Sequence, residues 1–343
     1  MNSFKPIVLT FILGSLGAYL AWLLKFPIPY LMGPVIVSTF FALCGIMFTV
    51  PNPLRQFSFI TIGLSVGSNV TPQALSNATQ WPLSLLAMLA AIVVITFSCK
   101  TVLNKFFLMD KRSSLLASSP GHLSFVLILS VDTNSDTSKV AIIQSIRVLT
   151  LTLVTPIIIL LFSNSAFQPY ILEKSTLGVL SILCLFCLSI LSGFVLQKIR
   201  FPAPFLIAAM LCSTVTHSTN FTPGNVPPYL EITAFIILGT IIGSRFVNVT
   251  INKLKSCLSS GLILTFLSIF ISGIAAICVH YLTGIPLAHI FIAFAPGGLE
   301  TMVAMGSLLK AEPTYIAIHH VSRLFLLALL IPVLINRVKT NKS

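Results

Sequence analysis

Residues 296–300 read Pro-Gly-Gly-Leu-Glu, and residues 120–124, which lie 176 positions earlier, read Pro-Gly-His-Leu-Ser. Both stretches lie within long apolar segments, where Pro followed by Gly interrupts a helix and leaves backbone groups without their usual partners. Lipid cannot satisfy such groups, so each break must be buried in protein or must line a watery cavity. The sequence therefore predicts one discontinuous or re-entrant helix in each half of the chain.

The whole chain is too apolar for a water-soluble protein. Hydrophobic residues make up 56% of its 343 residues and charged residues only 8%, whereas soluble proteins have about 45–50% and about 25%. This composition excludes a soluble enzyme and predicts an all-α polytopic membrane protein. The net charge of +13 comes from Lys and Arg at the ends of apolar runs, as in cytoplasmic membrane loops, so we expect a lipid partner and no nucleic acid. The seven Cys lie almost wholly in apolar stretches, so we expect no disulfide framework.

The break belongs to a longer internal repeat. Aligning residues 118–159 with residues 294–335 gives ten identities in 42 positions, and Pro, Gly and Arg recur in the same order. Such self-similarity indicates two copies of one ancestral unit. We therefore expect a first membrane repeat over residues 1–170 and a second repeat of inverted orientation over residues 171–343.

Each repeat divides into six apolar pieces. The pieces cover approximately residues 6–24, 30–50, 56–70, 82–103, 113–131 and 139–162, and then 176–197, 204–220, 230–247, 257–281, 286–309 and 314–336. The fifth piece of each repeat carries the Pro-Gly break. If both fifth pieces re-enter the side that they leave, 15 cationic side chains lie inside and three outside, and Arg147 and Arg323 lie within spans. If all pieces cross the membrane, ten of the same 18 cationic side chains lie inside and eight lie outside. The positive-inside rule favours the first arrangement: about ten transmembrane helices, two re-entrant segments and cytoplasmic termini.

Two glycine pairs also recur in the repeats. Gly63 and Gly67 correspond to Gly239 and Gly243, and each pair has the spacing that allows helices to approach closely. We interpret them as packing residues.

Short ordered motifs recur in both halves of the chain. They are the 296–300 run with Glu312 and His320-x-x-Arg323, the first-half counterpart Pro120-Gly121-x-Leu123 with Asp136 and Gln144-x-x-Arg147, and the Phe-Pro-x-Pro segments at 26–29 and 201–204. Together these motifs resemble the membrane AbrB family. The resemblance covers essentially the whole chain and implies the fold of the cation/proton antiporter and anion transporter group. Members of the family also carry the labels transcriptional regulator and ammonia monooxygenase. One departure is His122, which stands where the motif has its second Gly.

The predicted substrate-binding residues lie at the two breaks and in the last helix of each repeat. They are Pro120, Gly121, His122, Pro296, Gly297, Gly298, Arg147 and Arg323. Helix starts after the breaks would point free N–H groups inward and favour anions. An arginine inside the membrane is costly, so we interpret it first as a functional residue. Its planar guanidinium group offers donors that suit a carboxylate or phosphonate. The alternatives are a packing kink and a fixed salt bridge.

The predicted ion-coupling residues are Glu300, Asp136, Glu312 and His320. A carboxylate at membrane depth can bind Na⁺ or cycle a proton, and histidine can shuttle protons. Glu300 follows the second break by two residues and is the preferred candidate. Asp136 and Glu312 have an equally good alternative explanation as loop charges or helix caps. For His320 the alternative is a polar side chain that hydrogen-bonds to another helix. None of the histidine clusters has metal-ligand spacing, so we expect no metal and no cofactor beyond H⁺ or Na⁺.

Inverted repeats with broken helices at matching positions are typical of secondary transporters. The sequence therefore predicts an ion-coupled transporter of a small anionic or zwitterionic organic solute in the inner membrane of a bacterium. This prediction is compatible with a homodimer. The alternative is a membrane protein that regulates gene expression, as one family label implies. A membrane monooxygenase is disfavoured because the metal ligands are missing, so we expect no enzyme.

Overall fold

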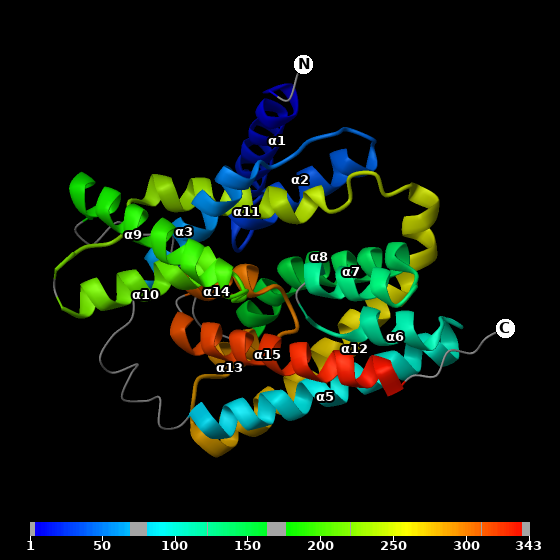
Figure 1. Cartoon of the computed structure of the whole chain (residues 1–343). Coiled ribbons are helices and arrows are strands. Elements are labelled where there is room, and N and C mark those ends of the chain that lie inside the picture. Colours follow the sequence, from blue (N-terminus) through cyan, green and yellow to red (C-terminus); the bar gives the residue numbers. More distant parts are fainter. Residues whose placement is uncertain are drawn as a thin grey trace. The chain divides into compact units, whose positions relative to one another are not determined.

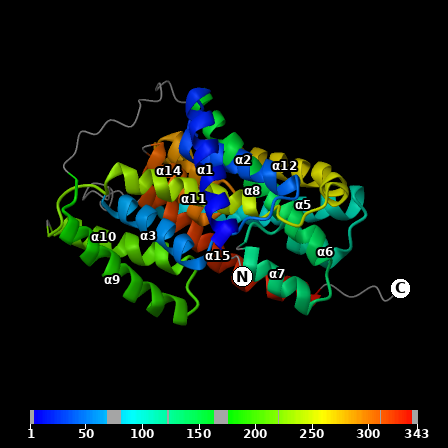
Figure 2. The same cartoon turned by 90° about the horizontal axis from the view of Figure 1, so that it is seen from above.

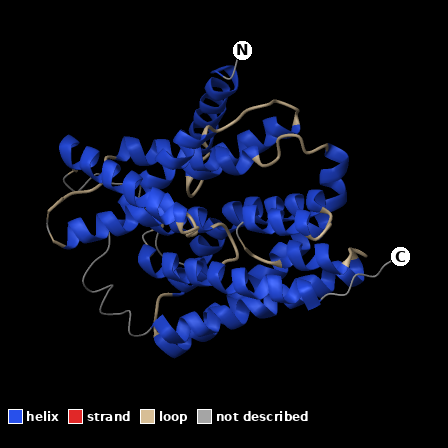
Figure 3. Cartoon of the chain, in the orientation of Figure 1, coloured by secondary structure: helices blue, strands red, loops and turns tan. Residues whose placement is uncertain are grey.

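The computed structural model describes residues 4–68, 81–121, 123–162, 176–219, 221–309 and 311–337, and within these ranges it is helical apart from one isolated bridge between Thr176 and Asn225 (Figures 1 and 3). The helices of the first half are α1 (Phe4–Leu23), α2 (Pro29–Leu43), α3 (Asn52–Ser68), α5 (Trp81–Phe106), α6 (Lys111–Ser118), α7 (Leu123–Asp132) and α8 (Thr137–Phe162). Those of the second half are α9 (Val179–Lys198), α10 (Pro204–Ser218), α11 (Pro228–Ser244), α12 (Ile251–Thr283), α13 (Leu287–Phe294), α14 (Leu299–Leu308) and α15 (Pro313–Arg337). The predicted all-helical class is confirmed.

Five of these helices are long and apolar enough to cross a membrane. They are α5, α8, α9, α12 and α15, and six further apolar helices have 10–17 residues. A helix of 17 residues is about 26 Å long at 1.5 Å per residue, which is slightly shorter than a hydrocarbon core of about 30 Å. The helices are consistent with a membrane protein. The number of ten spans stays a prediction.

The Pro-Gly sequences interrupt the fifth apolar piece of both halves, as predicted. In the first half α6 ends at Ser118 and α7 begins at Leu123, and in the second half α13 ends at Phe294 and α14 begins at Leu299. The bounds of α13 and α14 are those of α6 and α7 moved by 176 positions. The discontinuity is therefore confirmed, while the re-entrant course and the inverted orientation of the halves stay predictions.

One helix is shorter than its predicted apolar piece, because the backbone conformation ends the helix before the apolar run ends. The run at 30–50 continues to Val50, but α2 ends at Leu43. Gly45 adopts a φ of +87°, and the N–H of Ile46 donates to the carbonyl of Phe41 at 3.0 Å. A left-handed glycine with this bond is a Schellman cap, so apolar residues 46–50 leave the helix.

The chain forms two compact units, and each combines segments of both halves. Unit 1 contains Met1–Ala78, Thr152–Asn248 and Leu299–Tyr315, and unit 2 contains Thr79–Leu151, Val249–Gly298 and Ile316–Ser343. The predicted repeat boundary at residues 170 and 171 lies outside the described residues. The two repeats therefore stay a prediction from the sequence.

Unit 1 is built from closely packed helix pairs. Helix α3 packs on α10, α2 packs on α11, and α9 lies beside α10 (Figure 2). A Cβ added to Gly67 would lie 2.5 Å from the carbonyl oxygen of Met210, and one added to Gly239 would lie 2.6 Å from that of Leu31. The glycine pairs therefore allow backbone-to-backbone contact between these helices.

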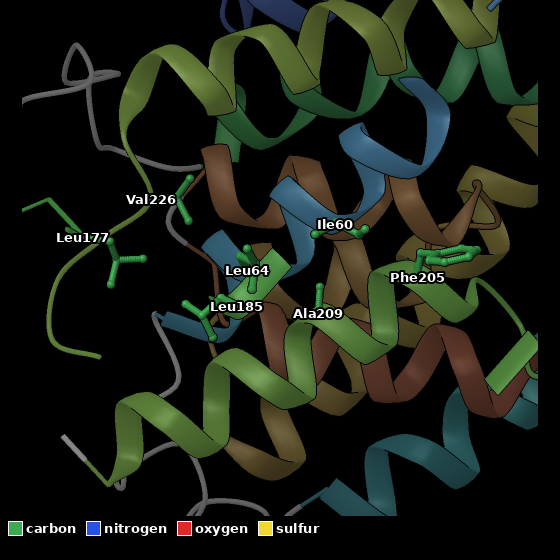
Figure 4. Close-up of a cluster of buried hydrophobic side chains, with 7 residues drawn as sticks. All are labelled: Ile60, Leu64, Leu177, Leu185, Phe205, Ala209 and Val226. Carbon is green, nitrogen blue, oxygen red and sulfur yellow. The ribbon is translucent and has the colours of Figure 1, made fainter. Parts of the chain in front are cut away.

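A hydrophobic cluster fills the space beside the α3–α10 pair. Figure 4 shows its seven buried side chains, which are Ile60, Leu64, Leu177, Leu185, Phe205, Ala209 and Val226. They come from α3, α9, α10 and two neighbouring loops. These contacts join segments more than 100 residues apart in the sequence.

The interior of unit 2 is more polar. Helix α5 packs on α12 and on α6, and α12 packs on α13. Hydroxyls, amides, imidazoles and guanidinium groups are buried among these helices. They include Ser113, Ser118, Ser119, Gln144, Arg147, Ser268, Ser272, His319, His320 and Arg323. Buried polar groups need hydrogen-bond partners, and in unit 2 these partners include the backbone at the two helix breaks.

Gly239→Ala should destabilise the protein by about 1–3 kcal/mol, because the new Cβ overpacks the helix contact and forces a backbone shift. This outweighs the better helix propensity of Ala, which is about 1 kcal/mol. Thermal unfolding of the detergent-solubilised protein measures the effect. Gly178→Ala is the control, because its Cβ would meet no atom within 4 Å. Equal melting temperatures for the two variants would contradict the proposed close contact.

Candidate functional site

The two breaks are built alike. The N–H of Ser119 donates to the carbonyl of Leu115 at 3.1 Å, and the N–H of Ala295 donates to that of Phe291 at 2.9 Å. These bonds close the last turns of α6 and α13 one residue before a proline, which has no N–H to continue the helix. Each break thus exposes the carbonyl groups at the C-terminal end of a short helix.

The predicted break residues lie mainly inside the protein. Pro120, Pro296 and Gly297 are buried, whereas Gly121 and Gly298 are partly exposed. His122 lies outside the described residues. The positions after the breaks open α7 and α14, so the N-terminal N–H groups of both helices directly follow the breaks in the chain.

The two predicted arginines bind the breaks of their own repeats. The Nη2 of Arg147, on α8, donates to the carbonyl of Ser119 at 3.3 Å. On α15, Arg323 donates through Nη1 to the carbonyl of Ala295 at 3.0 Å and through Nη2 to that of Gly297 at 2.6 Å. Ser119 and Ala295 are equivalent positions of the repeat.

Both arginines are almost fully buried, with 4% of Arg147 and 1% of Arg323 exposed. Each guanidinium lies at the C-terminal end of a short helix, where the helix dipole favours a cation. The bonds to the carbonyls of Ser119, Ala295 and Gly297 satisfy donors of both guanidinium groups. The arginines therefore support the shape of the breaks and place a positive charge beside them.

A second side chain binds each short helix one turn before the arginine. The Nε2 of Gln144 donates to the carbonyl of Leu116 at 2.9 Å and to that of Ser119 at 3.3 Å. The Nε2 of His320 is 3.0 Å from the carbonyl oxygen of Ile292. Leu116 and Ile292 are again 176 positions apart. In the sequence Gln144 stands out only as part of a motif, and its equivalence to His320 in the repeat is the signal that could have identified it.

His319, next to His320, contacts other helices of unit 2. Its Nε2 lies 2.8 Å from the Oγ of Ser84 on α5, and its ring lies 6.0 Å from that of Phe294 on α13. Both Ser84 and His319 are fully buried. Nothing in the sequence singled out Ser84, because a serine in an apolar helix shows no periodic signal for a partner 235 positions away.

The predicted acidic residues belong to both units: Asp136 to unit 2, and Glu300 and Glu312 to unit 1. Asp136 caps α8: its carboxylate accepts the N–H of Lys139 at 3.0 Å and lies 3.2 Å from the Lys139 ammonium. Glu312 is the residue before α15, and desolvation by burial raises its pKa although contacts with Thr314 oppose the shift. Glu300 belongs to the first turn of α14 in unit 1, where the Arg245 guanidinium attracts its charge.

One buried acidic residue was not among the residues predicted from the sequence. Glu231 lies in the first turn of α11 and is only 4% exposed. Its signal was a lone carboxylate three residues after Pro228, at the start of an apolar piece. For metal binding, no group of three or more His, Cys, Asp or Glu within the described ranges is arranged to hold an ion.

The fold and the site define an all-helical protein whose two halves each contain a helix broken at Pro-Gly and bound by a buried arginine. A family model described as transition state regulatory protein AbrB matches residues 1–68 and 41–339. The chain therefore belongs to the AbrB family, as the motifs predicted.

Two relatives match over most of their lengths. One is YhjN, an uncharacterized protein of Bacillus subtilis (strain 168), which is 23% identical over 93% of this chain and 90% of its own length. The other carries the name regulator AbrB in Escherichia coli (strain K12) and is 25% identical over 92% of this chain and 91% of its own length.

Arg323→Met should lower the melting temperature strongly, because it leaves the carbonyls of Ala295 and Gly297 without these bonds. An unsatisfied buried polar group costs about 1–3 kcal/mol. Arg337→Met is the matched control, since Arg337 is exposed at the end of the same helix and such surface changes stay within about 0.5 kcal/mol. Similar unfolding curves for both variants would exclude the stabilising bonds.

Asp136→Asn should destabilise the protein only where the wild-type carboxyl is ionised. Burial opposes ionisation of Asp136, but hydrogen bonds and charge from Lys139, with a smaller effect of Lys253, hold its pKa below the ordinary value of 3.8. A carboxyl whose pKa is lower in the folded than in the unfolded protein adds to the stability of the fold at pH values above its unfolded pKa. This added stability is lost as the pH falls through the folded pKa. The difference in stability between the two proteins should thus be constant above 3.8 and shrink below it. A difference that grows on acidification would contradict this assignment.

Proposed function

We propose that this chain is an integral membrane protein that transports a small anionic or zwitterionic organic solute, coupled to H⁺ or Na⁺. The observation that carries the proposal is the pair of broken helices at equivalent positions, each bound by a buried arginine. Broken helices in a membrane protein have to lie in protein or beside water, and matching breaks in two repeats are typical of solute sites in secondary transporters.

The charge at the breaks supports an anionic group on the solute. Arg147 and Arg323 place guanidinium groups beside the breaks. The N-termini of α7 and α14 follow the same breaks, and the positive ends of helix dipoles favour anions. A carboxylate or phosphonate fits this combination of donors.

Coupling requires a group that gains and loses a cation during transport. Of the four predicted residues, Asp136 is bonded to Lys139 and Glu312 precedes α15. Glu300 and His320 are closer to the second break: Glu300 follows Gly298 by two residues, and His320 is bonded to the last turn of α13. These two are therefore the preferred coupling residues.

We place the protein in the inner membrane of a bacterium, with cytoplasmic termini and about ten spans. Five long apolar helices, the apolar composition and the bacterial relatives support this location. The lipid bilayer and the solute are the proposed partners, a homodimer is compatible with the proposal, and no nucleic acid or enzyme activity is part of it. The proposal needs no cofactor apart from the coupling ion.

A regulatory function is the second candidate, because the Escherichia coli relative carries the name of a regulator. The two functions differ in whether solute crosses the membrane. A thermal-stability screen of carboxylates, phosphonates and amino acids, followed by uptake of each stabilising compound into proteoliposomes, separates them. Uptake that depends on an ion gradient supports a transporter, whereas stabilisation without uptake favours a sensor.

Arg147→Lys and Arg323→Lys should each reduce uptake about tenfold or more, because lysine cannot reproduce the planar fork of donors. Both variants should still insert, since most cationic residues of the loops are unchanged. Arg337→Lys on the exposed end of α15 should transport normally. Full uptake by both site variants would show that the arginines serve the structure alone.

A further inference from the structure

Several helix ends of unit 2 are joined by hydrogen bonds. Helix α5 ends at Phe106 and packs on α6, which begins five residues later (Figure 1). In the first turn of α6, Arg112 donates through Nη1 to the carbonyl of Thr133 at 3.2 Å, and the Oγ of Ser113 accepts the N–H of Asp136 at 2.8 Å. Thr133 and Asp136 belong to the turn between α7 and α8. The end of α5, the start of α6, the end of α7 and the start of α8 therefore lie together.

Helix α12 begins at the same place. It runs beside α8, because a Cβ added to its Gly261 would lie 2.8 Å from the Cγ2 of Ile146. In its first turn, Lys253 is close enough for its charge to act on the carboxylate of Asp136. These helix ends all belong to unit 2. They carry a group of cationic residues that we call the basic rim: Lys105, Lys111, Arg112, Lys139, Lys253 and Lys255.

The acidic residues beside the basic rim do not neutralise it. Asp110 accepts two backbone N–H groups at the start of α6, and Asp136 is bonded to Lys139. With Asp132 there are three acidic residues against six cationic ones. Four lysines are exposed and form no ion pair with another residue of the described ranges: Lys105, Lys111, Lys253 and Lys255.

Exposed apolar side chains alternate with these cations along the chain. Between Lys105 and Lys111 lie Phe106, which is 77% exposed, and Leu108, which is 87% exposed. Exposed apolar residues on the neighbouring helices are Ile128, Val131 and Ile251. Exposed apolar groups mark contacts with a protein or a membrane, whereas a soluble anion would engage the cations and leave these side chains in water. The combination fits a ligand with both a charged end and an apolar end.

The backbone holds Leu108 in its exposed position. Its φ is +50°, a region that bulky residues rarely adopt. The N–H of Met109 donates to the carbonyl of Leu103 at 3.2 Å, and the side-chain amide of Asn104 donates to the carbonyl of Met109 at 2.9 Å. Leu108 is thereby the most exposed large apolar side chain among the described residues. A strained backbone that keeps a leucine outside the fold points to a contact beyond the chain.

We propose that the basic rim and the residues around Leu108 bind anionic phospholipid. The lysines bind the headgroup phosphates, and Phe106 and Leu108 lie among the acyl chains. A lipid with net negative charge fits better than a zwitterionic one, because the rim has an excess of cations and anionic headgroups attract clustered Lys and Arg. Bound lipid would hold the outer ends of α6 and α7, so that lipid composition acts on the helix that contains the first break.

The first test uses the full-length protein in an uncharged detergent. Short-chain phosphatidylglycerol or short-chain phosphatidylcholine is added in increasing amounts, and the rise in melting temperature gives an apparent affinity. Phosphatidylglycerol should bind about tenfold more tightly or better. The preference should shrink as sodium chloride rises from about 0.1 M to about 1 M, since the screening length falls from about 10 Å to about 3 Å. Equal affinities for the two lipids would overturn the proposal.

Matched pairs of substitutions test whether the basic rim is the site. Lys253→Gln with Lys255→Gln should weaken binding of phosphatidylglycerol about tenfold or more and leave binding of phosphatidylcholine unchanged. Lys198→Gln with Arg200→Gln is the control, because these residues are exposed at the end of α9 in unit 1 and remove the same charge from the protein. The control should bind like the wild type. Equal losses in both pairs would show that only the total charge matters and would overturn the proposal.

A third variant tests the apolar part of the surface without a cost to folding. Leu108→Gly removes the side chain and suits the left-handed backbone, so it should melt no lower than the wild type. It should bind phosphatidylglycerol severalfold more weakly, and an unchanged affinity would overturn the contact with acyl chains. Inorganic phosphate should not stabilise the wild type. Equal stabilisation by phosphate and by the lipid would assign the rim to a soluble anion instead.

This inference rests on the proposed function only for the location in a membrane. Solute uptake into proteoliposomes by a protein that shows no preference for phosphatidylglycerol would support the transport function and overturn the lipid surface alone. A wild type that does not incorporate into any bilayer would overturn the membrane location and the lipid surface together.

Discussion

Backbone carbonyl groups that are exposed where two helices break are the constraint on which the candidate site depends. A prolyl residue ends α6 and α13, and the last carbonyls of both helices then need donors that neither lipid nor the helix supplies. Arg147 and Arg323 supply them from α8 and α15. The approach of these long helices to the short ones follows from this need, because a guanidinium reaches its acceptors only when the helices pack together. The other buried polar side chains of unit 2 meet the same need for hydrogen bonds.

This arrangement has an electrical consequence. Each guanidinium brings a positive charge into a medium of low dielectric constant, where charges interact strongly. This is why the proposed solute carries an anionic group. The two breaks have similar backbone bonds, so they differ mainly through their side chains. The replacement of glutamine by histidine at one equivalent position is such a difference, because it adds a titratable group to one half alone.

The two compact units meet different physical requirements. Unit 1 gains its stability from helices whose backbones touch at Gly67 and Gly239 and from the apolar cluster around Leu64 and Phe205. Close packing of this kind leaves little space for adjustment, because interiors are dense. Unit 2 instead buries hydroxyl, amide, imidazole and guanidinium groups that bond to one another and to backbone carbonyls. We therefore place the proposed solute site among the polar side chains of unit 2.

Composition and pattern were sufficient to predict the helical class, the position of both helix breaks, the close glycine contacts and the family. Each of these depends on local chemistry: proline removes an N–H, glycine lacks a Cβ, and apolar runs avoid water. The sequence alone did not show that α2 ends at Leu43, because a Schellman cap depends on the conformation of Gly45 and not on hydrophobicity. It also did not show which acceptors Arg147 and Arg323 bind, that Gln144 and His320 hold equivalent carbonyls, or that Ser84 contacts His319. Those facts were decided by the tertiary structure, because hydrogen bonds between helices depend on how the helices are placed in space, and residues up to 235 positions apart leave no local signal of their contact.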